Sequence, residues 1–275
     1  MSIFKKAAKD ASKTTGNLVG NMASVNVQNS TNAAVDGMDL FRWKMGTPII
    51  QNGHFDQQKG NLFEYIEAAK FNADAAGKGM SARAVVTDVY DQGAAADILI
   101  KEGGKVQKEV QAKFVKSSNK DVENSAARSV FDQAGGQKGH WGKYKGMDRL
   151  IRKDEHYNAE GSMLDEAKKL AKSRAESGSI HAEDFKDVHE HLTDELHYGD
   201  ASSGGTTFEE VQMAYESPEK YAKAFERKAV KAEMKCTTAN MAKASFDIVN
   251  IGLHFFLKDV RPMLPPVMNR SIVDA

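Results

Sequence analysis

The chain has 275 residues, of which 41% are hydrophobic and 28% are charged, proportions typical of a folded protein rather than a disordered or low-complexity one. Lys plus Arg and Asp plus Glu both number 38, so the formal net charge is zero and gives no argument for a nucleic-acid partner. The length suits one large domain or two ordinary ones.

The opening residues, the single cysteine and the longest apolar run all bear on localisation. Cys236 cannot form an internal disulfide, and the early lysines are not followed by the apolar region of a signal peptide. The longest apolar run, "FDIVNIGLHFFL", contains Asp247 and His254 and is shorter than the roughly 18 residues that a membrane-spanning helix needs. These features predict a cytoplasmic protein without a transmembrane span.

Composition divides the chain into three predicted segments. Residues 1–36 are rich in Asn, Ser, Thr, Gly and Ala and predict a flexible N-terminal arm. Residues 37–135 would form a folded core that contains all the strands, because strand patterns end near residue 118. Residues 136–275 are predicted to be mostly helical, with helices that begin after Ser162, Thr207 and Ser217.

The core is predicted to contain one helix followed by three strands. Residues 60–79 predict a helix whose apolar stripe includes Leu62 and Ile66 and which stops at Gly77. Residues 82–93 predict a strand closed by a turn, and residues 95–100 and 105–115 predict a hairpin.

The alternation of the hairpin decides which side chains share a face. The even positions are apolar, so a loop with an odd number of residues, Glu102-Gly103-Gly104, would place both apolar faces on one core. That register puts Asp97 opposite Glu109 and gathers Asp97, Glu109, Gln111 and Lys113 on the other face.

Two carboxylates, an amide and a lysine on one face suit metal-assisted hydrolysis of a phosphodiester. Carboxylate and carbonyl oxygens bind Mg²⁺, and a nearby cation can hold the attacking water or the developing charge. A solvated face of alternating charge would look the same in the sequence. Asp97 favours the functional interpretation because it interrupts an apolar run, where an aspartate is disfavoured unless it is paired.

Residues 58–116 resemble the PD-(D/E)XK nuclease superfamily, and most closely its Mrr-type restriction endonuclease branch. The resemblance rests on "GNLFE" opening a helix, "TDVYDQG" ending a strand, "ADI" before the hairpin and "VQAKF" closing it. It implies an α/β (α+β) core with a small mixed sheet and an N-terminal core helix, to which the mostly helical C-terminal half is added.

The resemblance also implies the roles of individual residues. Asp97 would be the principal ligand of Mg²⁺ or Mn²⁺, Glu64 an outer ligand of the metal or of water, and Lys113 the catalytic lysine. Gln111 would be a metal ligand at a position where most of the superfamily has Glu or Asp. Glu64 could instead belong to a helix-capping pair with Asn61, three residues earlier.

Two further acidic residues are candidates for an assisting role. Glu67 lies one helical turn after Glu64 and is its rival for the same function. Glu109 lies on the polar face of the hairpin, where it could assist or be solvated.

The best local basic patch is "GGQKGHWGKYKGMDRLIRK". Basic residues interleaved with aromatic ones suit a phosphate backbone and stacked bases, although a solvated glycine-rich loop has the same composition. The predicted nucleic-acid contacts are Lys138, His140, Trp141, Lys143, Tyr144, Lys145 and Arg149.

The sequence therefore predicts a metal-dependent endonuclease acting on DNA more readily than RNA, in restriction, phage defence or as a toxin. The alternative is a non-catalytic binding protein that retains the nuclease fold. A homodimer, or a partner protein bound through the helical half, would be compatible with either function.

Overall fold

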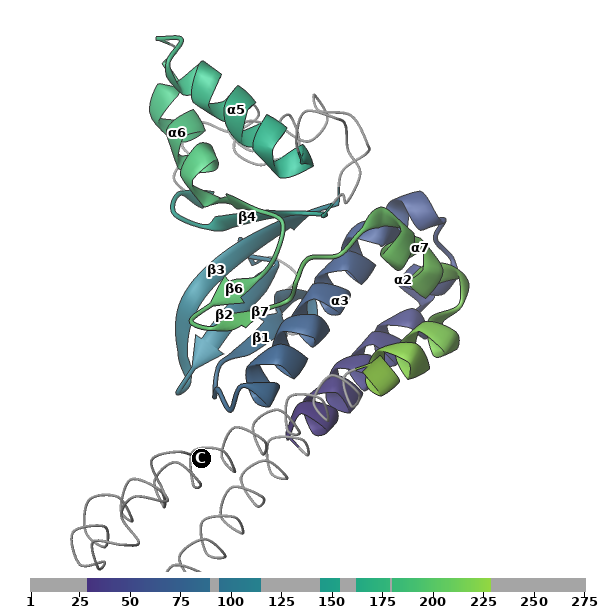
Figure 1. Ribbon diagram of the computed structural model, residues 1–275. Coiled ribbons are helices and arrows are strands. Elements are labelled where there is room, and N and C mark those ends of the chain that lie inside the picture. The colour runs from purple at the N-terminus through teal and green to yellow at the C-terminus, as the bar shows by residue number, and fades with distance from the viewer. Residues whose placement is uncertain (1–28, 90–93, 115–143, 154–161, 179, 229–275) are drawn as a thin grey trace, which may run out of the picture. The chain divides into compact units, whose positions relative to one another are not determined.

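A five-stranded mixed sheet is the centre of the computed structural model, which describes residues 29–89, 94–114, 144–153, 162–178 and 180–228. Its order is β1-β2-β3-β4-β5, antiparallel from β1 to β3 and parallel from β3 to β5. The strands are β1 (Arg83–Val86), β2 (Ile98–Glu102), β3 (Lys105–Lys113), β4 (Asp148–Ile151) and β5 (Leu192–Thr193). The predicted mixed class, α and β with a small mixed sheet, is confirmed (Figure 1).

The prediction that strands end near residue 118 is wrong. β4 and β5 come from the half predicted to be mostly helical, and they extend the sheet beyond β3. A second, two-stranded sheet pairs β6 (His197–Tyr198) with β7 (Ala201–Ser202). Strands of two to four residues carry too few alternations to be distinguished from loops in a sequence.

The helices include the predicted ones and others that were not predicted. The bounds are α2 (Pro48–Gln51), α3 (Phe55–Gly77), α5 (Met163–Ala175), α6 (Ala182–His191) and α7 (Phe208–Glu216), with a 3₁₀ turn, η1, at Thr87–Val89. The hydroxyls of Ser162 and Thr207 accept hydrogen bonds from Asp165 N and Glu210 N, which confirms both predicted caps. The described residues 218–228 are helical, as expected after Ser217.

The described residues 29–45 also form a helix. Its first part, residues 29–36, was predicted to belong to a flexible N-terminal arm. Phe41 of this helix packs against Tyr221 of helix 218–228, with ring centroids 5.8 Å apart. All the described residues belong to one compact unit, Asn29–Val230, so the segment boundaries predicted after residues 36 and 135 both fall inside it. Within the described residues, every helix is too short or too polar to cross a membrane.

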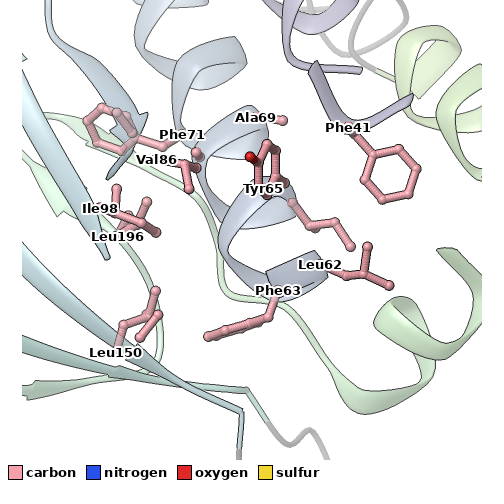
Figure 2. Close-up of a cluster of buried hydrophobic side chains, with 14 of the residues drawn as sticks. Phe41, Leu62, Phe63, Tyr65, Ala69, Phe71, Val86, Ile98, Leu150 and Leu196 are labelled. Atoms are coloured by element: carbon pink, nitrogen blue, oxygen red, sulfur yellow. The ribbon is translucent and has the colours of Figure 1, made fainter. Parts of the chain in front are cut away.

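Helix α3 lies against the sheet and supplies much of the hydrophobic core. It begins at Phe55, earlier than predicted, and ends at Gly77 as predicted. Leu62, Ile66 and Phe63 are fully buried, and Figure 2 shows α3 side chains between those of helix 29–45 and those of the sheet. Burying side chains of this size contributes roughly 1.5–3 kcal/mol each, so α3 is held firmly and the polar residues on it are held with it.

The register of the hairpin differs from the predicted one by two residues. Gly103 and Gly104 both have positive φ angles, +57° and +78°, and form a two-residue turn in place of the predicted three-residue loop. That turn alone would reverse the faces, but a β-bulge between Ile100 and Lys101 restores them. Ile98 therefore pairs with Val110, which brings Asp97 level with Gln111 and not with Glu109.

Helix α3 is also tied to the segment between β7 and α7 by a buried carboxyl group. Glu67 has no exposed surface, and its Oε2 accepts a hydrogen bond from the Ser203 hydroxyl. Lys70, one turn along α3, donates to the carbonyl of Gly205 and pairs with Glu210 of α7. Burial raises the pKa of Glu67 to about 7, although the Ser203 hydrogen bond acts in the opposite direction.

Helix 29–45 packs closely against α3 at Gly37. A Cβ atom placed on Gly37 would lie 2.7 Å from the Cβ of Ala69, which is too close for two side-chain carbons. A Cβ atom placed on Gly60 of α3 would have no atom within 4 Å apart from the neighbouring backbone of its own helix. The position of Gly37 therefore has no room for a side chain, whereas the position of Gly60 does, although both glycines lie in helices.

We expect Gly37→Ala to destabilise the protein and Gly60→Ala to stabilise it. The first substitution forces two helices apart, at a cost of about 1–2 kcal/mol, whereas the second gains about 0.5–1 kcal/mol of helix propensity. Urea unfolding of the two variants measures both changes. Equal effects of the same sign would contradict the close approach at Gly37.

We expect Glu67 to make stability depend on pH between about 4.5 and about 7. The folded state retains the Glu67 proton after the unfolded state has lost it, so the contribution of this group is fully present below pH 4.5 and is lost as pH rises through about 7. The loss should be about 3 kcal/mol. Glu67→Gln stays neutral and should flatten the pH dependence of unfolding, whereas the exposed Glu190→Gln should leave it unchanged.

Candidate functional site

The structure brings together three residues that the sequence singled out, each from a different element. Glu64 lies on α3, Asp97 immediately precedes β2, and Lys113 is the last residue of β3. Burial raises the pKa of Glu64 well above its usual value, the charge of Asp97 raises it further, and the charge of Lys113 lowers it. The three side chains are therefore close enough to share one electrostatic environment.

Asp97 is held in place by hydrogen bonds from both sides. Its Oδ2 accepts from the Ala112 N–H of β3 at 2.8 Å, and its backbone carbonyl accepts from the Thr87 N–H at 2.9 Å. Burial raises the pKa of Asp97, while Lys113 and the Ala112 hydrogen bond lower it. One carboxylate oxygen, Oδ2, is thus fixed by the sheet.

Gln111 lies level with Asp97 and pairs on its other side with Arg149 of β4. Only 3% of Gln111 is exposed, and its side-chain carbonyl oxygen has no hydrogen-bond partner among the described residues. A buried acceptor without a donor costs roughly 1–3 kcal/mol. A bound cation or an ordered water at Gln111 Oε1 would remove that cost.

A buried lysine and a third carboxylate lie beside these residues and were not predicted. Asp88 of η1 raises the pKa of both Glu64 and Asp97, and Lys44 of helix 29–45 lowers that of Glu64. Lys44 forms an ion pair with Asp88 Oδ2, and the Tyr65 hydroxyl donates to Asp88 Oδ1 at 2.7 Å. Nothing in a single sequence distinguishes Lys44 or Asp88 from an ordinary surface charge.

The oxygen atoms at this site are of the kind that Mg²⁺ or Mn²⁺ binds. Among the described residues, no three His, Cys, Asp or Glu side chains are grouped closely enough to hold a metal ion by themselves. The predicted set differs from such a trio, since it has the two carboxylates of Asp97 and Glu64 and the amide of Gln111. Two acids that both have a raised pKa, beside a buried carbonyl without a partner among the described residues, fit a divalent cation.

The two assisting candidates do not join this group. Glu67 is the rival to Glu64, but its carboxyl is buried against Ser203 instead. Glu109 is exposed and lines a cavity of about 660 Å³ together with Lys145 and His191, and neither Asp97 nor Gln111 lines that cavity.

The predicted nucleic-acid contacts are only partly described. Lys138, His140, Trp141 and Lys143 lie outside the described residues. Tyr144 is buried with Ala96 and Met147. Arg149 is 1% exposed, and its guanidinium is bound by Asp187 Oδ2 at 2.8 Å and by the carbonyl of Met147. Tyr144 and Arg149 are thus part of the interior, and Lys145 is the exposed member of the described set.

The description of the candidate site rests on the structure of this chain. No family model, no curated protein and no solved structure matches this chain.

Proposed function

We propose that this protein is a metal-dependent nuclease of the PD-(D/E)XK type. What supports the proposal above all is that Glu64, Asp97 and Lys113, to which the resemblance gives the main roles, act on one another electrostatically in the fold. The small mixed sheet with α3 packed against it also supports the proposal, because the resemblance implies a mixed sheet and a core helix.

In this proposal Asp97, Glu64 and Gln111 hold the metal ion through oxygen atoms. When bound, Mg²⁺ or Mn²⁺ supplies charge stabilisation to the phosphodiester and lowers the pKa of a bound water. Asp97 is suited to be the central ligand because the Ala112 N–H fixes its orientation and leaves Oδ1 free of that bond. The raised pKa of Glu64 would return toward its usual value once a divalent cation offset the neighbouring charges.

Lys113 would act on the water or the phosphate rather than on the metal. It is the last residue of β3, two positions after Gln111 and on the same face of the strand. Its ammonium group lies near Asp97 and Glu64, where it can orient the attacking water or stabilise the negative charge that develops on phosphorus oxygens. Hydrolysis then requires no covalent intermediate with the protein.

DNA is the proposed substrate, in restriction, phage defence or as a toxin, because the Mrr-type nucleases act on DNA. The rival proposal is a protein that keeps this fold and binds nucleic acid or a partner without cutting. Its specific support is that Gln111 stands where a carboxylate would bind a metal more strongly.

We expect the wild-type protein to cut plasmid DNA with Mg²⁺ or Mn²⁺ and not with a chelator. Asp97→Asn retains an acceptor for the Ala112 N–H but loses the charge, and Lys113→Met removes the cation. Each should lower the cleavage rate by at least roughly 100-fold, as expected for loss of a metal ligand or a charge-stabilising group. Gel assays of plasmid DNA and total RNA measure the rate and identify the substrate.

Lys105→Met is the matched control, because Lys105 is an exposed lysine at the start of the same strand. It should cut at the wild-type rate. If the wild-type protein cuts neither polymer, or if cutting persists in Asp97→Asn and Lys113→Met, the nuclease proposal fails and the binding protein is favoured.

A further inference from the structure

A cluster formed by Lys44, Tyr65 and Asp88 joins three elements next to the candidate site. Lys44 comes from helix 29–45, Tyr65 from α3 and Asp88 from η1. Both carboxylate oxygens of Asp88 are used, one by the Lys44 ammonium and the other by the Tyr65 hydroxyl. The Lys44 ammonium also lies 5.4 Å from the centre of the Tyr65 ring. The cluster is thus closed, and each member contacts the other two.

The cluster is connected to both proposed acidic ligands through the backbone. Tyr65 directly follows Glu64 on α3, so fixing its hydroxyl fixes the turn of helix that carries Glu64. Asp88 directly follows Thr87, whose N–H donates to the carbonyl of Asp97 and whose hydroxyl donates to that of Ala96 at 2.6 Å. Asp88 therefore links the element that carries Glu64 to the turn that holds Asp97.

Burial makes this linkage costly to break and unsuited to a direct catalytic role. Only 7% of Lys44 is exposed, and a buried ammonium without its carboxylate is strongly destabilised. Because Lys44 is occupied by Asp88, it is not available to a phosphate. Asp88 has no oxygen without a partner, so it is a poor candidate for a metal ligand.

We infer that Lys44, Tyr65 and Asp88 are positioning residues that set the separation of Glu64 and Asp97 for a divalent cation. This inference rests on the proposed metal-dependent function of the same site. It assigns a role to helix 29–45, which lies outside the segment that resembles a nuclease. Residues that orient metal ligands from outside the coordination sphere typically change affinity or activity by about 10–100-fold when they are removed.

Binding of Mn²⁺ tests the inference because positioning and simple charge effects predict opposite results for Lys44. The variants are Lys44→Met, Asp88→Asn and Tyr65→Phe, of which Tyr65→Phe removes a single hydroxyl and is the least disturbing to folding. Electron paramagnetic resonance measures free Mn²⁺ in a titration of the full chain, and thermal unfolding checks that each variant is folded.

If the cluster positions the ligands, all three variants bind Mn²⁺ about tenfold or more weakly. The Lys44→Met Asp88→Asn double variant should then be little weaker than either single one, because both break the same link. If the cluster acted by charge alone, Lys44→Met would bind Mn²⁺ more tightly than the wild type, since it removes a positive charge. If the cluster served only stability, the unfolding temperature would fall while Mn²⁺ affinity stayed unchanged. Either of these last two results would overturn the inference.

Lys59→Met is the matched control, because Lys59 is another largely buried lysine, and its partner Asp56 lies on α3 itself. It should leave Mn²⁺ affinity unchanged. A wild-type protein that binds no Mn²⁺ would overturn the proposed function, and this inference with it. Normal binding by the wild type and by all three variants would overturn the inference alone.

Discussion

The hydrogen bond from the Ala112 N–H to the Asp97 carboxylate depends on the register of β2 and β3, and the candidate site depends on that bond. The register is the result of two local features, the Gly103-Gly104 turn and the bulge between Ile100 and Lys101. Without the bulge, the two-residue turn would send Asp97 and Gln111 to opposite faces of the sheet. A bulge at this place thus positions a polar side chain next to a site, as bulges often do.

Charge balance is the second constraint on the site. Burial raises the pKa of Glu64 and of Asp97, and the charge of Asp88 raises both further. The two lysines from other elements, Lys44 and Lys113, offset part of this repulsion. Lys44 is paired with Asp88, and Lys113 is the lysine whose charge lowers the pKa of both Glu64 and Asp97. A divalent cation is the natural complement of such an arrangement.

The sequence predicted the elements whose signals are local. The apolar stripe of α3, the stop at Gly77 and the caps at Ser162 and Thr207 each depend on neighbours a few residues apart, and the structure confirms all of them. Parity placed Asp97, Gln111 and Lys113 on one face, since parity survives an error of two residues in the register.

What the sequence could not predict depends on partners far along the chain. β4 pairs with β3 and β5 pairs with β4, both in parallel and across long connections, and each strand is too short to show alternation. Lys44 is buried in an ion pair with Asp88, a partner that lies far from it in the sequence. The predicted register was wrong because Glu102-Gly103-Gly104 satisfied the parity as well as the observed turn with its bulge does.

Glu64 and Glu67 show why spacing on a helix is insufficient to choose between two acids. They lie three residues apart on α3 and both have a raised pKa caused mainly by burial. Glu67 accepts a hydrogen bond from the Ser203 hydroxyl, which satisfies one oxygen and ties α3 to the segment before α7. Glu64 instead lies near enough to Asp97 and Asp88 for their charges to raise its pKa. A buried acid beside a hydroxyl can remain protonated and serve stability, but acids beside one another call for a cation. The chemistry of the neighbours, and not the burial that the two residues share, separates the candidate ligand from the structural carboxyl.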